Sequence, residues 1–346
     1  MRSLSQDCYR DGMDGGEDHG PSIWWWAFGY FAAYAPYSAL TKALSSGRLG
    51  PRLDGFVVLP IAVIASTIGM GIFLAATGWW RAATRFTLAG RSLPTPTRRT
   101  VVSGACTSAI LVTTTLAYTF EGVSIVFAML LMRGGVLIIA PIVDALSGRR
   151  VQARSWVALG LTLAALVVAF AERGGFALPT AAALDIALYL ASYFVRLRLM
   201  SGAAKSARHD DNRRFFVEEQ LVASPLSLAV LALWAMSGAG GATGADLREG
   251  FVGLWGSAAA LWLLLIGTLS QLTGIFGGLI LLDRRENTFC VPVNRASSVL
   301  AGVVGSVTLW ALGVGRMPST HELVGAALIV AAIVVLSMPA RAPARA

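Results

Sequence analysis

The sequence contains few charged residues. Asp, Glu, Lys and Arg make up 14% of its 346 residues, whereas hydrophobic residues make up 55% and the mean hydropathy is +0.66. Soluble domains carry about 25% charged residues. This composition therefore excludes an ordinary soluble protein and predicts an all-α integral membrane protein. The formal net charge of +9 then reports on the orientation of the chain in the bilayer, and it gives no reason to expect a nucleic-acid partner.

Cysteine and histidine are also scarce. The three cysteines are far apart without a CxxC pattern, and the three histidines fall in expected tails or loops. A disulfide framework and a zinc site are therefore not expected. No GxxxxGK[ST] run is present, which argues against a P-loop ATP site. No intramembrane histidine and no carboxylate pair at catalytic spacing is visible, so we expect neither a cofactor nor an enzyme.

Long apolar runs predict ten membrane-spanning helices. About 20 apolar residues are needed to cross the bilayer core, and such runs occupy 23–45, 55–79, 100–119, 123–145, 155–172, 179–199, 217–238, 253–282, 288–313 and 320–338. Residues 1–22 are polar and acidic, which predicts a disordered cytoplasmic tail rather than a cleaved signal peptide. Residues 339–346 form a second predicted cytoplasmic tail.

The distribution of arginine and lysine predicts the orientation. When the N-terminus is placed inside, twenty of the 28 basic residues fall in inside segments and five in outside loops; the other three are Lys42, Arg133 and Arg295. Cytoplasmic loops are enriched in basic residues. The pattern therefore predicts that both termini are inside, and a missed or extra span would destroy the alternation.

The two halves of the chain resemble each other. A helix with a central arginine, small residues, a short loop and a further helix occur at 123–170 and again at 288–338. The interval from Arg133 to Gly160 is 27 residues and that from Arg295 to Gly325 is 30. Because each half has an odd number of spans, residues 23–172 and 179–338 are predicted to be inverted five-helix repeats. That layout places a solute site at the midplane between the halves.

Several short segments carry a resemblance to a known family. They are Leu116-Ala117-Tyr118, Val123-Ser124-Ile125-Val126-Phe127, the Gly148-Arg149-Arg150 loop, the Trp156 helix, and the helix ends Ser38-Ala39-Leu40-Thr41-Lys42-Ala43-Leu44 and Tyr193-Phe194-Val195-Arg196. Over about 23–338 the chain resembles the EamA-like branch of the drug/metabolite transporter superfamily. The resemblance implies ten helices in two repeats and transport of a small organic solute.

The chain departs from that family pattern in two places. The family often has proline in the fourth and ninth helices, near the positions of Arg133 and Arg295, and it often has Gly-Glu-Arg where this chain has Gly148-Arg149-Arg150. Relatives that translocate phosphates and nucleotide sugars use cations in those helices. The departures therefore favour an anionic solute.

Arg133 and Arg295 are the strongest candidate site residues. A cation near the bilayer centre costs about 2.5–3.5 kcal/mol on insertion scales, and neither arginine is close enough to a helix end to reach the interface easily. One interpretation is a guanidinium pair that binds phosphate or carboxylate. The other is structural, with each arginine bonded to a helix end or to an acid such as Asp185.

Other polar residues are weaker candidates. Asn294 is predicted to orient solute or to satisfy the neighbouring backbone freed by Pro292. Gln271 is predicted to contact solute or to serve helix packing, and Lys42 either gates the site or extends to the interface. Asp185 either carries a coupling proton or, as we favour, pairs with Arg133 or Arg295. Four more residues are expected to have ordinary structural roles. Tyr118 is expected at the membrane interface, Arg196 among the cations that set the topology, and Glu218 and Glu219 at the start of the seventh helix.

These observations predict a secondary transporter for an anionic organic solute, placed in a bacterial inner membrane and active as a monomer or homodimer. The alternative within transport is export of neutral or cationic metabolites, with the arginines serving a structural role. An intramembrane enzyme acting on a lipid phosphate would need a nucleophile or general base that is not visible. A receptor or accessory subunit would need a soluble domain, and the short loops leave no room for one.

Overall fold

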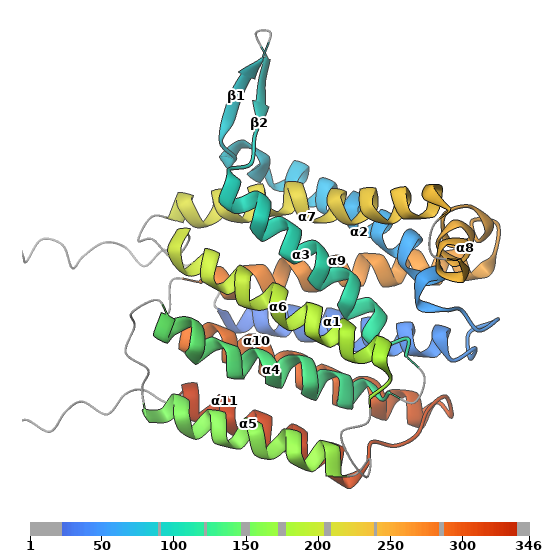
Figure 1. Ribbon diagram of the computed structural model, residues 1–346, viewed down its shortest axis with the longest axis vertical. Coiled ribbons are helices and arrows are strands. Elements are labelled where there is room, and N and C mark those ends of the chain that lie inside the picture. Colours follow the sequence, from blue (N-terminus) through green and yellow to red (C-terminus); the bar gives the residue numbers. More distant parts are fainter. Residues whose placement is uncertain are drawn as a thin grey trace, which may run out of the picture.

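The computed structural model describes residues 23–88, 91–120, 123–146, 153–171, 178–203, 209–238, 241–283 and 287–337. Within these residues the chain is almost entirely helical (Figure 1). The long helices are α1 Ile23–Ser45, α2 Gly55–Thr77, α3 Arg98–Ala117, α4 Ile125–Leu146, α5 Ala153–Ala171, α6 Thr180–Ala203, α7 His209–Ser237, α9 Ala258–Leu282, α10 Asn287–Ala311 and α11 Thr320–Ser337. The short elements are a 3-10 turn Trp79–Ala82, strands β1 Arg85–Leu88 and β2 Arg91–Pro94, helix α8 Ala242–Arg248 and a π-helical turn Glu249–Gly253.

Within the described residues, six helices are long and apolar enough to cross a membrane, and they lie in α2, α3, α4, α6, α7 and α9. The protein is therefore an integral membrane protein. Most helix bounds agree with the apolar runs of the sequence, with two differences. Helix α7 begins at His209 rather than at 217, because its first turns are polar. Helix α9 begins at Ala258 rather than at 253, because α8 and the π-helical turn precede it.

Local sequence signals explain several helix ends. Asp54 caps α2, accepting a hydrogen bond from the Phe56 backbone N–H, and Gly78 ends the helix in the left-handed conformation (φ 67°). Thr97 caps α3 by accepting from the Thr100 N–H. Short polar side chains at the N-cap satisfy backbone donors that would otherwise be unpaired, and glycine adopts positive φ without steric cost.

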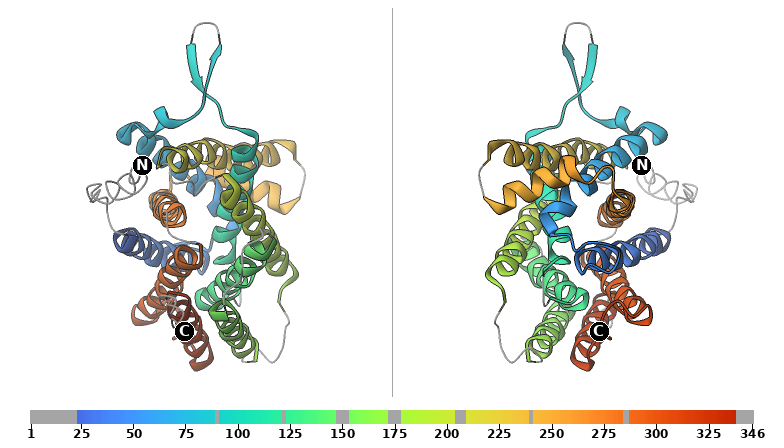
Figure 2. Two further views of the ribbon diagram at one scale, coloured as in Figure 1. Left: turned by 90° about the vertical axis from the view of Figure 1, so that its left-hand side faces the viewer. Right: turned by 90° about the vertical axis from the view of Figure 1, so that its right-hand side faces the viewer.

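Successive long helices run in opposite directions, and they pack side by side as one bundle (Figures 1 and 2). Helix α1 packs against α9 and α10, whereas α6 packs against α3 and α4. Helix α2 packs on α9 as α7 packs on α3, and α5 and α11 pack on each other. When α1 to α5 are matched in order to α6, α7, α9, α10 and α11, each of these contacts corresponds to another contact of the same set or to itself. For example, the contact of α1 with α9 corresponds to that of α6 with α3. We call this correspondence the exchange symmetry.

Two close helix contacts depend on glycine. A Cβ added to Gly104 of α3 would lie 2.6 Å from the Val222 Cβ of α7, and a Cβ added to Gly267 of α9 would overlap the Ala62 carbonyl oxygen of α2. Small residues let membrane helices approach closely. The two glycines therefore occupy equivalent contacts, α3 on α7 and α9 on α2.

The outer surface of the bundle is apolar. Large side chains such as Trp25, Phe28, Leu233 and Leu261 are more than half exposed. In water such a surface would mark an interaction site or an aggregation hazard, but a bilayer solvates it. Among the described residues, by contrast, the largest fully buried side chain is that of Arg295. The interior of the bundle therefore contains a charged group.

A β-hairpin joins α2 to α3, where the sequence indicated only a basic loop. Its strands pair antiparallel, with Phe86 opposite Leu93. The carboxylate of Glu218 in α7 accepts four hydrogen bonds at the base of the hairpin, from the backbone N–H and the hydroxyl of Thr84, the Thr97 N–H and the Thr100 hydroxyl. This single buried carboxylate therefore ties both ends of the hairpin to the bundle.

Candidate solute site

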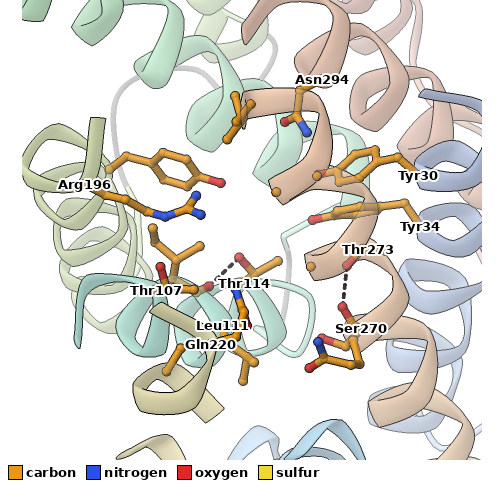
Figure 3. Close-up of a pocket in the computed structure, with 18 of the residues that line it drawn as sticks. Tyr30, Tyr34, Thr107, Leu111, Thr114, Arg196, Gln220, Ser270, Thr273 and Asn294 are labelled. Carbon is orange, nitrogen blue, oxygen red and sulfur yellow. Dashed lines mark hydrogen bonds between the residues drawn. The ribbon is translucent and has the colours of Figure 1, made fainter. Parts of the chain in front are cut away.

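The bundle contains a small central cavity of about 90 Å³. Its wall comes from seven helices: α1, α3, α4, α6, α7, α9 and α10. Tyr30 and Tyr34 lie on one side, Arg196 and Thr107 face them, and Asn294 and Ser270 lie at the margins (Figure 3). A water needs roughly 10–15 Å³ of such space, so the cavity has room for several waters or a small ion.

Arg133 of α4 lies on the cavity wall and is 2% exposed. Its two terminal nitrogens donate hydrogen bonds to the hydroxyls of Tyr189 and Tyr34. The guanidinium carbon is 5.2 Å from the ring centre of Tyr34 and 5.4 Å from that of Tyr189. Aromatic faces attract cations, more so when both are desolvated. Tyrosines of α1 and α6 therefore hold this arginine in place.

Arg295 of α10 is fully buried and lies directly behind the wall. Its Nη1 donates a 3.3 Å hydrogen bond to the Tyr189 hydroxyl, and its guanidinium carbon is 4.5 Å from the ring centre of Tyr193, which lines the cavity. Arg295 itself is not among the lining residues. The structure thus places both arginines around one tyrosine, with Arg133 exposed to the cavity and Arg295 separated from it by Tyr193.

The two arginines have equivalent positions along their helices. Arg133 is the ninth residue of α4 and Arg295 is the ninth of α10. Each repeat-like half also supplies a pair of tyrosines four residues apart whose tilted rings are in contact, with ring centres 5.2 Å apart for Tyr30–Tyr34 in α1 and 4.7 Å apart for Tyr189–Tyr193 in α6. Sequence reasoning missed these tyrosines, although their common spacing in the first and sixth helices is a readable signal.

Several polar atoms at the centre have no hydrogen-bond partner. Among the described residues these are Arg133 Nε, Arg295 Nε and Nη2, Asn294 Oδ1 and Ser224 Oγ. Among the described residues, neither Arg133 nor Arg295 forms a salt bridge. Buried polar groups are normally satisfied, and unpaired buried charges are costly. The centre therefore has guanidinium N–H donors without acceptors and positive charge without a counter-ion. A bound anion would accept those hydrogen bonds and neutralise that charge.

The expected ion pair between Asp185 and an arginine is not formed. Asp185 lies on the buried face of α6, 7% exposed, and neither of its carboxylate oxygens has a hydrogen-bond partner. The arginine nitrogens bond tyrosines instead. The physical reason is position: Asp185 lies one turn before Tyr189 along α6, and the Tyr189 hydroxyl already occupies the point at which the two guanidinium groups meet.

Within the described residues, a buried ion pair joins two residues to which the sequence gave default roles. Arg196 Nε and Nη2 donate to Glu219 Oε1 and Oε2 at 2.8 and 2.7 Å, and Ser103 and Thr107 also donate to Glu219. Arg196 is thus a cavity-lining residue rather than an interfacial topology cation. Glu219, like Glu218, lies well inside α7 rather than at its start, because the helix begins earlier than the hydropathy indicated.

The remaining sequence candidates fall in different places. Gln271 lines the cavity, and its Oε1 accepts a 2.6 Å hydrogen bond from Ser66 of α2; Asn294 also lines it. Lys42 lies away from the cavity and donates to the backbone carbonyls of Phe120 and Val123 at 3.0 and 2.9 Å. Tyr118 is buried rather than interfacial, with its hydroxyl 2.7 Å from that of Tyr34.

Comparison with known proteins gives a structural likeness only. No protein-family model matches the chain, and no curated protein matches it. One solved structure, described as the crystal structure of a protein, is similar with a TM-score of 0.53 and 17% sequence identity, over 91% of this chain and 96% of that chain. Identity this low shows the fold alone. Among the described residues no cluster of metal-binding side chains occurs.

Proposed function

We propose that the protein is a secondary-active transporter that moves a small anionic organic solute, bearing phosphate or carboxylate, by alternating access. The observation that carries the proposal is the pair of buried arginines, which share one tyrosine hydroxyl and have no acidic partner in the described chain. Intramembrane cations in a central cavity mark solute or ion pathways. A guanidinium with free N–H groups suits the oxygens of phosphate and carboxylate.

The exchange symmetry of the helix contacts supports an arrangement of two inverted five-helix repeats, residues 23–172 and 179–338, with ten spans. Such repeats place a solute site at the midplane between the halves, and we assign the two arginines and the two tyrosine pairs to that site. Together with the resemblance to the EamA-like branch of the drug/metabolite transporters, this arrangement supports membership of that superfamily. The basic loops support cytoplasmic termini, and the composition supports a bacterial inner membrane.

The cavity of about 90 Å³ is small for a metabolite, so we infer that the surrounding helices move apart when the solute binds. The exchange symmetry offers a mechanism, because one half can rock against the other around a fixed centre. Asp185 is a candidate for the coupling proton, because a buried acid without a partner inside a membrane protein is typical of proton pathways. We propose no enzymatic activity.

Ligand-dependent stability tests the proposal. The purified protein is heated in detergent with phosphorylated, carboxylated, neutral and cationic metabolites, for the wild type, Arg133→Gln and Arg295→Gln. A ligand present at 100 times its dissociation constant stabilises the native state by about 2.7 kcal/mol. We expect stabilisation by anions in the wild type and its loss in both variants. Arg48→Gln, an exposed arginine between α1 and α2, is the matched control and should keep the effect.

The competing function makes the opposite prediction. If the protein exports neutral or cationic metabolites and the arginines are structural, those compounds stabilise it and the stabilisation persists in Arg133→Gln and Arg295→Gln. That outcome would contradict the anion proposal, because the tyrosines of the wall would then bind the solute without the guanidinium groups.

A further inference from the structure

The β-hairpin exposes an apolar pair away from the bundle. Strands β1 and β2 leave the end at which α2 finishes and α3 begins, and they project across the direction of the helices beyond α7 (Figures 1 and 2). Phe86 and Leu93 are directly opposite in the register, so they share a face, and they are 58% and 48% exposed. A lone two-stranded hairpin is marginally stable in water, so this pair calls for a partner surface.

The charge around the hairpin has one sign. Residues 79–99 contain five arginines and no acidic residue: Arg81, Arg85, Arg91, Arg98 and Arg99. The guanidinium carbons of Arg85 and Arg81 lie 5.2 and 5.6 Å from the ring centre of Trp80. Tryptophan beside basic residues is typical of the membrane interface. The partner surface is therefore expected to be negative and to accept aromatic side chains.

The base of the hairpin is held firmly. Glu218 binds both of its ends, and Trp79 packs in edge-on contact with Phe73 of α2 and Phe216 of α7 at 5.5 and 5.9 Å between ring centres. The hairpin direction is consequently set by the bundle. Because the hairpin projects across the helices, it runs along the plane of the membrane that those helices span.

A cavity of about 430 Å³ adjoins the hairpin base, lined by Arg98, Arg99 and Arg214 together with two acids. Both acids already have partners: Asp211 pairs with Arg214 at 3.1 Å, and Glu218 binds the hairpin ends. Arg98 and Arg99 lie in the first turn of α3, where the helix dipole disfavours cations. The uncompensated charge here thus matches that of the hairpin.

We propose that the hairpin and its base form a docking surface for anionic phospholipid of the adjacent leaflet. The arginines contact headgroup phosphates, and Phe86 and Leu93 enter the boundary between headgroups and acyl chains. A second copy of this chain is the less favourable occupant, because two hairpins of the same strong positive charge repel. The inference uses the membrane location and does not depend on which solute the central site binds.

Hydrogen exchange in defined bilayers tests the docking. The full chain is reconstituted in nanodiscs of phosphatidylcholine alone, or of phosphatidylcholine and phosphatidylglycerol in equal parts, and exchange of the strand amides at 85–88 and 91–93 is measured. Each basic residue at an anionic surface contributes roughly a fivefold gain in binding. We expect exchange to slow by at least about fivefold in the anionic discs, and added salt should weaken the effect.

Variants separate the two contributions. Arg85→Gln should reduce the protection in anionic discs, and the double variant Phe86→Ser with Leu93→Ser should remove it, while Arg48→Gln at the opposite end should keep it. Equal exchange in both lipid compositions would overturn the proposal. So would protection that is indifferent to lipid charge and appears only when two copies share one disc, since that result identifies a second copy as the occupant. Solute binding plays no part in the readout, so this result and that of the solute experiment are independent.

Discussion

Arg133 and Arg295, from helices far apart in the sequence, donate hydrogen bonds to the same acceptor, the hydroxyl of Tyr189. One neutral oxygen therefore lies between two buried cations that lack acidic partners in the described chain. The like charges repel each other in a medium of low dielectric constant. The arrangement is stable only because ring faces and hydroxyl dipoles offset part of that repulsion, and it leaves the centre ready to bind a negative group.

Removing the shared acceptor should destabilise the centre. In Tyr189→Phe both arginines lose a hydrogen-bond partner while buried, which costs about 1–3 kcal/mol of unfolding free energy. Denaturant unfolding in detergent measures this loss. We also expect anions to stabilise the variant more than the wild type, because more donors are unpaired.

The matched control is Tyr30→Phe. Tyr30 lines the same cavity, but its hydroxyl has no hydrogen bond in the described structure. Tyr30→Phe therefore breaks no hydrogen bond and should avoid the loss of about 1–3 kcal/mol expected for Tyr189→Phe. Equal effects of the two substitutions would show that the Tyr189 hydroxyl does not hold the arginines.

Asp185 should separate coupling from exchange. Asp185→Asn removes the charge while preserving the shape of a buried side chain that has no partner. We expect uptake driven by a proton gradient to fall at least about tenfold, whereas exchange of labelled for unlabelled solute across vesicles persists, because the solute site remains intact. Transport assays in proteoliposomes measure both rates. Wild-type gradient-driven uptake in the variant would remove Asp185 from the coupling mechanism.

Replacing one member of the ion pair between Arg196 and Glu219 should destabilise the protein more than replacing both. Glu219→Gln leaves Arg196 buried without its counter-ion, which typically costs about 3–5 kcal/mol. Replacing both residues with apolar side chains of similar volume, Arg196→Met and Glu219→Leu, should restore much of that loss. Thermal unfolding of the wild type and these two variants compares them. A double variant less stable than Glu219→Gln would indicate that the pair stabilises the fold on balance.

Close helix packing at the two glycines should be equally intolerant of bulk. Gly104→Val and Gly267→Val each force helices apart, at α3–α7 and α9–α2 respectively, and overpacking of this kind costs about 1–3 kcal/mol or more. Gly71→Ala is the control, because an added Cβ there meets nothing within 4 Å; alanine in a helix should be neutral or stabilising by up to about 1 kcal/mol. Melting temperatures in detergent report the differences.

Agreement between sequence and structure is closest for the helix bounds. The runs at 23–45 and 320–338 correspond to Ile23–Ser45 and Thr320–Ser337, because hydrophobic run length is a local property. Sequence and structure differ where polar residues form regular structure, because run length reports only on apolar segments. The polar first turns of α7 are helical, and the basic loop after α2 forms a hairpin whose base is fixed by Glu218, a residue more than a hundred positions away in the sequence.

Prediction was less complete at the candidate site. The sequence located Arg133 and Arg295 because charge inside an apolar helix is conspicuous, and Gln271 and Asn294 do line the cavity. It assigned Asp185 as the arginine partner and missed Tyr34 and Tyr189. Acids are conspicuous in such a segment and tyrosines are not, although a buried guanidinium is satisfied by ring faces and hydroxyls as well as by carboxylates.

The sequence by itself determined that this chain is a helical membrane protein, where its long helices lie, and that two cations are placed in the middle of two of them. Those properties follow from composition and run length, which are carried by neighbouring residues. Only the tertiary structure decided that both cations meet at Tyr189, that Glu219 neutralises Arg196 and that Asp185 has no partner. Such pairings depend on the rotation and depth of helices from distant parts of the chain, which packing sets.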